Sequence, residues 1–262
     1  MRLLECVNGK LRLTIDLARD IPEYAILSHT WGLDSEEVTF RDLVDGTGEN
    51  KTGYEKIRFC AEQARRDGLQ YFWVDTCCID KSNNTELSTA INSMFRWYHN
   101  AARCYVYLSG ISAAGRKSSA IIRDPAFRTH RWFTRGWTLQ ELLAPVSVEF
   151  FTQDGQRLGD KRSLEQHIRE ITGIATLALR DNDLSQFDIE ERFKWAKTRQ
   201  TTHEEDWAYC LLGIFGIFMP LIYGEGKAHA VHRLEKEIAN AMSREDGSGR
   251  QAGTLPALIC QH

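Results

Sequence analysis

One acidic residue stands out because it lies in an otherwise apolar stretch: Glu141, between Trp137 and Leu143. A carboxylate in such surroundings must be solvated, paired or functional, because burying an unpaired charge is costly. Partly buried acids are also common at active sites. A carboxylate beside a ribose can hold the sugar hydroxyls and stabilise the positive charge that develops as a glycosidic bond breaks. We therefore take Glu141 as the candidate catalytic residue; the alternative is a helix-surface acid paired with Arg135.

A second group of candidate residues lies at the end of the first expected strand, residues 24–28, and consists of Ser28, His29, Thr30 and Trp31. Ligands of open parallel sheets bind beyond the carboxyl ends of the strands, so these residues are expected to form a pocket wall. Trp31 can stack on a base or on nicotinamide, or it can simply pack. His29 titrates near neutrality and suits acid–base chemistry, although a single histidine is more often a structural hydrogen bonder.

Two further acids, Asp75 and Asp80, bracket the end of the second expected strand. They can bind ribose hydroxyls or order the loop, and Lys81 can meet a phosphate. Arg135 can bind a pyrophosphate, or it can belong to a basic surface with neighbouring arginines. The Gly-Glu-Gly segment at 224–226 has no strand leading into it and predicts a turn, not a phosphate-binding loop.

The elements that must position these residues alternate in type. Apolar runs at 24–28, 71–75, 104–108 and 146–151 predict four strands, and helical patterns at 54–66 and from Glu86 onward separate them. This alternation predicts βαβ units, and hence an α/β fold with a mostly parallel central sheet flanked by helices.

Beyond residue 152 the pattern changes to helices alone, at about 163–172, 189–197, 205–215 and 227–242. We expect an α/β core at 1–152, a helical C-terminal appendage at 153–242 and a flexible tail at 243–262, where Gly and Ser occur beside charges.

Composition limits the functions available. The chain has 262 residues, 42% of them hydrophobic, and a net charge of -3, which gives no electrostatic reason to bind nucleic acid. The apolar segments are too short or interrupted to indicate a signal peptide or a membrane span, so we expect a cytoplasmic protein. The seven cysteines are expected to be buried thiols, and the adjacent pair Cys77 and Cys78 lacks the spacing of a zinc site, so we expect no metal.

Three segments together resemble the motifs of the fungal HET (heterokaryon incompatibility) domain: YAILSHTWG at residues 24–32, WVDTCCIDK at 73–81 with SMF at 93–95, and FTRGWTLQEL at 133–142. RQTT at 199–202, EDWAY at 205–209 and YGEG at 223–226 are similar to the region that follows this core, so the resemblance covers about residues 1–240. It implies a cell-death role in fungal allorecognition and innate immunity. Members often precede a NACHT nucleotide-binding module and WD repeats in a longer protein.

The same segments resemble TIR domains more distantly, through Ser28 at a strand end, Asp80 after a second strand, and Trp137 four residues before Glu141. In catalytic TIR domains the acid of such a tryptophan motif cleaves NAD. This chain departs from the pattern at Thr138, where many TIR domains have cysteine. The resemblance implies a TIR-like (flavodoxin-like) sheet, with Glu141 as the catalytic acid and with Trp137 helping to shape the nucleotide pocket.

We therefore expect a death effector that consumes NAD as a substrate, needs no cofactor, and releases nicotinamide after it associates into a dimer or higher oligomer. The alternative is a noncatalytic death adaptor that acts by oligomerisation alone, with the aromatic motifs serving as core and interface residues.

Overall fold

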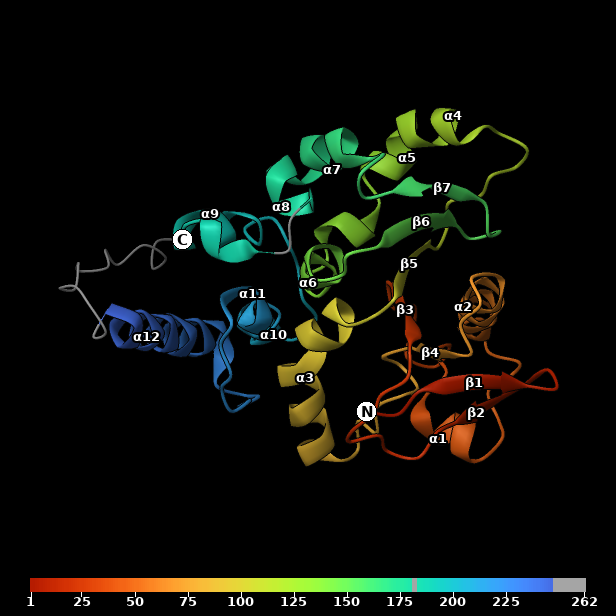
Figure 1. The fold of residues 1–262 in the computed structure, drawn as a ribbon, viewed down its shortest axis with the longest axis horizontal. Coiled ribbons are helices and arrows are strands. Elements are labelled where there is room, and N and C mark those ends of the chain that lie inside the picture. Colours follow the sequence, from red (N-terminus) through yellow and green to blue (C-terminus); the bar gives the residue numbers. More distant parts are fainter. Residues whose placement is uncertain (181–182, 247–262) are drawn as a thin grey trace.

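The computed structural model describes residues 1–180 and 183–246 and contains one seven-stranded sheet. Its strands lie in the order β2-β1-β4-β3-β5-β6-β7 (Figure 1). Their bounds are β1 Leu4–Val7, β2 Lys10–Leu13, β3 Tyr24–His29, β4 Tyr71–Trp73, β5 Arg103–Leu108, β6 Val148–Thr152 and β7 Arg157–Asp160. β3 lies at the centre and is buried along its whole length.

The four expected strands are confirmed as β3, β4, β5 and β6, and each pairs in parallel with its neighbour. These four strands lie side by side in the order β4-β3-β5-β6. If they are numbered 1 to 4 along the chain, the order is 2-1-3-4, which is how the strand order of flavodoxin-like sheets begins. The prediction of βαβ units with parallel strands is therefore confirmed for the middle of the sheet. A TIR-like fold in the full sense stays a prediction.

The sheet as a whole is mixed, and the expectation of a mostly parallel sheet was wrong. β1 pairs antiparallel with both β2 and β4, and β6 pairs antiparallel with β7. The β1–β2 hairpin turns through Asn8 and Gly9, whose φ angles of 52° and 78° are those of a two-residue hairpin turn. Short turns can connect only antiparallel neighbours, so β2 runs opposite to β1 and β7 runs opposite to β6.

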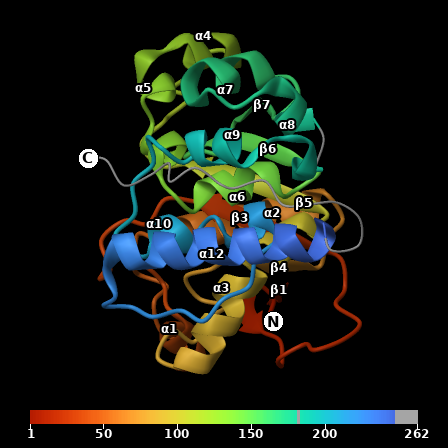
Figure 2. The same cartoon turned by 90° about the vertical axis from the view of Figure 1, so that its left-hand side faces the viewer.

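Helices cover both faces of the sheet, as expected. α2 (Tyr54–Arg66) packs on one face against β3, β4 and β5. α3 (Asn84–His99) and α6 (Thr138–Leu143) contact each other on the opposite face, where α6 also touches β3 (Figures 1 and 2). α3 begins where the Asn83 side chain accepts hydrogen bonds from the Thr85 and Glu86 amides, a cap that satisfies two otherwise free donors. The remaining early helices are short: α1 Phe40–Val44, α4 Ser118–Arg123, α5 Pro125–Arg128 and the 3-10 turn η1 Arg131–Thr134.

The C-terminal part contains the four expected helical regions. They appear as α7 (Glu165–Thr172), α9 (Ile189–Lys194), the pair α10 (Asp206–Tyr209) and α11 (Leu212–Phe215), and α12 (Gly226–Asp246), with α8 (Thr176–Arg180) and the turn η2 (Leu184–Gln186) between them. β7 was not expected and carries the sheet past residue 152. Residues 243–246 end α12, and the rest of the expected tail lies outside the described residues. The division into core and appendage stays a prediction.

Candidate functional site

The candidate acid and the end of the central strand meet in the interior. Ser28, in β3, donates a hydrogen bond from Oγ to Oε2 of Glu141 at 2.5 Å, and the same Oγ accepts one from Nε1 of Trp132 at 2.8 Å. Ser28 is fully buried and Glu141 is 7% exposed. Because Trp132 can only donate, it leaves the serine proton free for the carboxyl group. The three residues form one connected unit, which we call the acid site.

Burial controls the ionisation of Glu141. Burial, and to a smaller extent the negative charge of Asp75, raise the pKa of the carboxyl group to about 8 against the bond from Ser28 and the charge of Arg199, which both lower it. At neutral pH the group is therefore mostly protonated in the free protein. Arg135 is not its ion-pair partner in the described structure; that guanidinium donates to Oγ1 of Thr202 at 3.1 Å.

The helix that carries Glu141 is held by a segment far along the chain. The Gly136 amide donates to the Gln200 carbonyl at 2.9 Å, and Arg199 Nη1 donates to the Arg135 carbonyl at 2.7 Å. A Cβ at Gly136 would lie 2.5 Å from Cγ2 of Thr201, so only glycine permits this approach. The segment that begins at Arg199 therefore fixes the start of α6.

The two other expected residues next to α6 also face this segment. Trp137 donates from Nε1 to Oδ2 of Asp206 at 3.1 Å, and the other oxygen of Asp206 accepts from the Tyr223 hydroxyl at 2.9 Å. Arg135, through Thr202, contacts the same region. In this structure Trp137 and Arg135 join the core to the C-terminal helices.

A second polar group lies at the ends of β3 and β4. Asp75 accepts a hydrogen bond from Nε1 of Trp31 at 2.8 Å, and its other oxygen lies 3.6 Å from Nε2 of His29. Within the described part of the chain those last two atoms have no hydrogen-bond partner. Burial lowers the pKa of His29 well below its usual value, helped by the charge of Lys56, and burial likewise raises the pKa of Asp75. His29 is thus a neutral side chain beside an acid.

A pocket of about 360 Å³ opens beyond the carboxyl ends of β3 and β5. This is where the strand order of the parallel strands reverses, the usual ligand position in open α/β sheets. Of the expected residues, Thr30 and Trp31 line it, whereas in the described structure Ser28, His29, Asp75 and Glu141 do not. Its charged lining was missed from the sequence: Glu36, Glu37, Glu55, Lys56 and Arg131.

The buried ion pair of Glu37 and Lys56 forms part of this lining. Lys56 Nζ lies 2.6 Å from Oε1 of Glu37, and both side chains are buried. One feature of the sequence indicates that Lys56 is buried. Lys56 precedes Cys60 by four residues, so both lie on the buried face of α2. A lysine on such a face predicts a buried acidic partner, although not which one.

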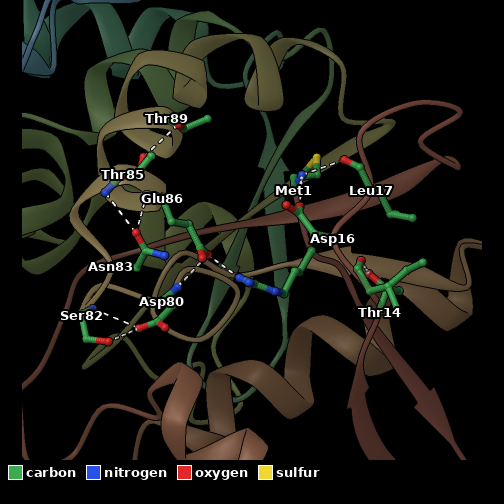
Figure 3. Close-up of polar contacts among 12 residues, drawn as sticks. Met1, Thr14, Asp16, Leu17, Asp80, Ser82, Asn83, Thr85, Glu86 and Thr89 are labelled. Atoms are coloured by element: carbon green, nitrogen blue, oxygen red, sulfur yellow. Dashed lines mark hydrogen bonds and ion pairs between the residues drawn. The ribbon is translucent and has the colours of Figure 1, made fainter.

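Asp80 lies just before α3, where it contacts Ser82 and Glu86 (Figure 3). Its Oδ1 accepts from the amide and hydroxyl of Ser82 at 3.0 and 2.6 Å, and its own amide donates to Glu86 at 2.9 Å. Glu86 also pairs with Arg2. These contacts correspond to the loop-ordering alternative for Asp80.

Residues 1–180 and 183–246 offer neither a metal-binding cluster nor a membrane-spanning helix. No cluster of three or more His, Cys, Asp or Glu side chains in them is arranged to hold a metal ion. None of the helices in those ranges has the length and apolarity needed to cross a bilayer.

Comparison with known proteins identifies the family. Residues 24–126 match the model of the "Heterokaryon incompatibility protein (HET)" family. The chain is 56% identical over 253 residues to the "Vegetative incompatibility protein HET-E-1" of Podospora anserina, an alignment that covers 94% of this chain and 18% of that longer protein. No solved structure matches. The matched region contains β3, β4 and β5, and the longer alignment extends through most of the rest, so the chain carries a HET domain.

Proposed function

We propose that this HET domain is a cell-death effector of heterokaryon incompatibility that cleaves NAD and releases nicotinamide. The observation that carries the proposal is the direct bond between Ser28, at the end of the central strand, and Glu141. A buried acid with a strongly raised pKa, close to the strand ends where ligands of such sheets bind, fits an active site better than a structural role. The relative's name, an incompatibility protein, supports the biological role.

In the proposed reaction, the bond between C1′ of the ribose and the nicotinamide nitrogen breaks. Nicotinamide leaves as a neutral molecule with the bonding electron pair, and the ribose becomes cationic. Ionised Glu141 stabilises that charge, water adds to C1′, and a proton is released with ADP-ribose. The positive charge of the bound nicotinamide ring favours ionisation of Glu141, which burial opposes in the free protein. Trp132 and Ser28 hold the carboxyl group in place.

Glu141 is 7% exposed, so a substrate can reach it only if neighbouring segments move. We propose that self-association of the domain drives this movement and thereby controls activity. The chain spans 18% of the length of its relative, and further modules of a longer protein would gather the copies.

The experiment measures nicotinamide release from NAD by concentrated protein, with light scattering on the same samples. Glu141→Gln keeps the size of the side chain and an acceptor for Ser28 but removes the charge. We expect a loss of about 3 to 4 kcal/mol in transition-state stabilisation, which slows turnover on the order of a few hundredfold. Glu62→Gln, at an exposed position of α2, serves as the matched control and should keep full activity.

Three outcomes would contradict the proposal. Cleavage at the wild-type rate by folded Glu141→Gln would remove Glu141 as the catalytic acid. Full activity in a strict monomer would remove the role of assembly. Killing by a wild-type protein that assembles but leaves NAD intact would favour the noncatalytic adaptor.

A further inference from the structure

The pocket beyond β3 and β5 contains a carboxylate oxygen that lacks a donor. Glu37 is 5% exposed and lines this pocket. Its Oε1 accepts from Lys56 Nζ and from the Gly32 amide, each at 2.6 Å. Its Oε2 is buried and has no hydrogen-bond partner in residues 1–180 and 183–246. An unsatisfied buried acceptor is costly, so this position is suited to a ligand that brings a donor.

A glycine lies directly beside that oxygen. A Cβ on Gly53, which also lines the pocket, would lie 3.1 Å from Oε2 of Glu37 and 2.6 Å from the Glu36 carbonyl oxygen. Any larger residue at this position would crowd Oε2 and clash with that carbonyl, so glycine is needed where a ligand hydroxyl is to reach Oε2. Lys56 meanwhile holds the carboxylate from its other oxygen, so the acceptor is oriented before a ligand arrives.

An aromatic surface and a free cation line the same pocket. Trp31 is 36% exposed and fixed by its bond to Asp75, and Lys81 Nζ lies 3.7 Å from its ring centroid. Lysine therefore occupies one face of the indole, and the exposed part of Trp31 in the pocket wall offers a surface on which a ring can stack. Arg131 is exposed and has no ion-pair partner within the ranges that the structure describes.

We propose that this pocket binds the adenosine 5′-phosphate half of the substrate, with adenine on Trp31, a ribose hydroxyl donating to Glu37 Oε2, and the phosphate on Arg131. The inference rests on the proposed function for the identity of the whole substrate. The positive charge of Lys81 behind Trp31 decides which half binds, because it repels the cationic nicotinamide ring and tolerates neutral adenine. The pocket volume of about 360 Å³ is near the lower end of the range for ligand pockets, which fits one nucleotide better than two.

Calorimetric titration of the wild-type protein with AMP, 2′-deoxy-AMP and 3′-deoxy-AMP tests the hydroxyl contact. A hydrogen bond to a charged acceptor corresponds to about a tenfold to hundredfold loss of affinity when one particular hydroxyl is removed. We expect that loss for one of the two deoxy ligands. Nicotinamide mononucleotide should bind more weakly than AMP. AMP has no nicotinamide bond to cleave, so this result stands or falls independently of NAD cleavage.

The residue assignment is tested with Glu37→Leu/Lys56→Met, which removes both charges of the buried pair together with the acceptor Oε2, and so avoids leaving one ion unpaired. In this variant the ratio of ribo to deoxy affinity should fall close to one. Glu55→Gln removes another carboxylate of the same pocket and should keep the wild-type ratio. Equal affinity of wild type for all three AMP ligands, tighter binding of nicotinamide mononucleotide, or an unchanged ratio in the double variant would each overturn the inference.

Discussion

Two regions of the molecule contain buried or half-buried acids, and the acids of the two regions differ in how completely they are hydrogen-bonded. In the C-terminal cluster, formed by Glu205, Asp206 and Glu225, the acids hold the chain together. Glu205 accepts the amides of Gly224 and Gly226, and Asp206 accepts from two aromatic side chains, one on each oxygen. Glu225 binds the Tyr209 hydroxyl and Arg233. These acids connect α10 to the start of α12.

At the strand ends the acids are incompletely paired. Asp75 and Glu37 each keep one buried oxygen without a partner in the described chain, and Glu141 has a pKa raised to about 8. In the described chain no donor reaches the unpaired oxygens of Asp75 and Glu37, whereas Asp206 in the C-terminal cluster has a donor on each oxygen. We infer that the strand-end region is arranged for a ligand and the C-terminal cluster for stability, and four measurements can break or sharpen that contrast.

The largest expected effect is on the pH dependence of NAD cleavage. If the ionised form of Glu141 is active, kcat/KM should rise about tenfold per pH unit below pH 8 and level off above it, because kcat/KM reports the pKa of the free enzyme. Initial rates from pH 6 to pH 9.5 test this. A rate that falls as the pH rises would mean that the protonated acid is the active form.

The next effect concerns Asp206 and stability. Asp206→Leu can accept from neither Trp137 nor Tyr223, so it leaves two part-buried donors without this acceptor. We expect a loss of about 1 to 3 kcal/mol in the free energy of unfolding, measured by urea denaturation at pH 7. An unchanged midpoint would show that these bonds contribute nothing, and the contrast between the two regions would fail.

In contrast to the change at Asp206, Glu141→Gln is expected to raise the free energy of unfolding relative to the wild type as the pH rises. The folded-state pKa of about 8 lies above the ordinary value of 4.5, so proton binding stabilises the native form fully below pH 4.5, and this contribution is lost as the pH rises through 8. Relative to Glu141→Gln, the wild type should lose about 2 kcal/mol between pH 6 and pH 8. Parallel urea titrations at the two pH values measure this. A constant difference would place the pKa of Glu141 outside this window.

The smallest effect is expected at Asp80. Its carboxylate orders the loop through Ser82 and lies apart from the acid site, so Asp80→Asn should leave NAD cleavage unchanged. The nicotinamide assay with matched protein concentrations checks this. A loss comparable to that of Glu141→Gln, in a folded protein, would return Asp80 to the substrate site.

The sequence by itself determined the strands and helices that follow from short-range patterns of apolar and polar residues. The apolar runs of β3, β4, β5 and β6 predicted buried parallel strands, and α2 was predicted with the bounds that it has. The outer strands were missed for a local reason as well. β1 and β2 are short and charged, and their only clear signal, the Asn8-Gly9 turn, was overlooked. The Glu141 stretch was likewise visible, because a lone acid among apolar residues is conspicuous.

Only the tertiary structure decided which groups meet. Ser28 and Glu141 are separated by 113 residues, and nothing in the periodicity of either segment indicates their contact. The same holds for Trp137 and Asp206, 69 residues apart, and for the buried pair of Glu37 and Lys56 in the pocket wall. Periodicity records which face of an element is buried, whereas partners across the sheet are chosen by packing and by the need to satisfy buried charges, which depend on the whole fold.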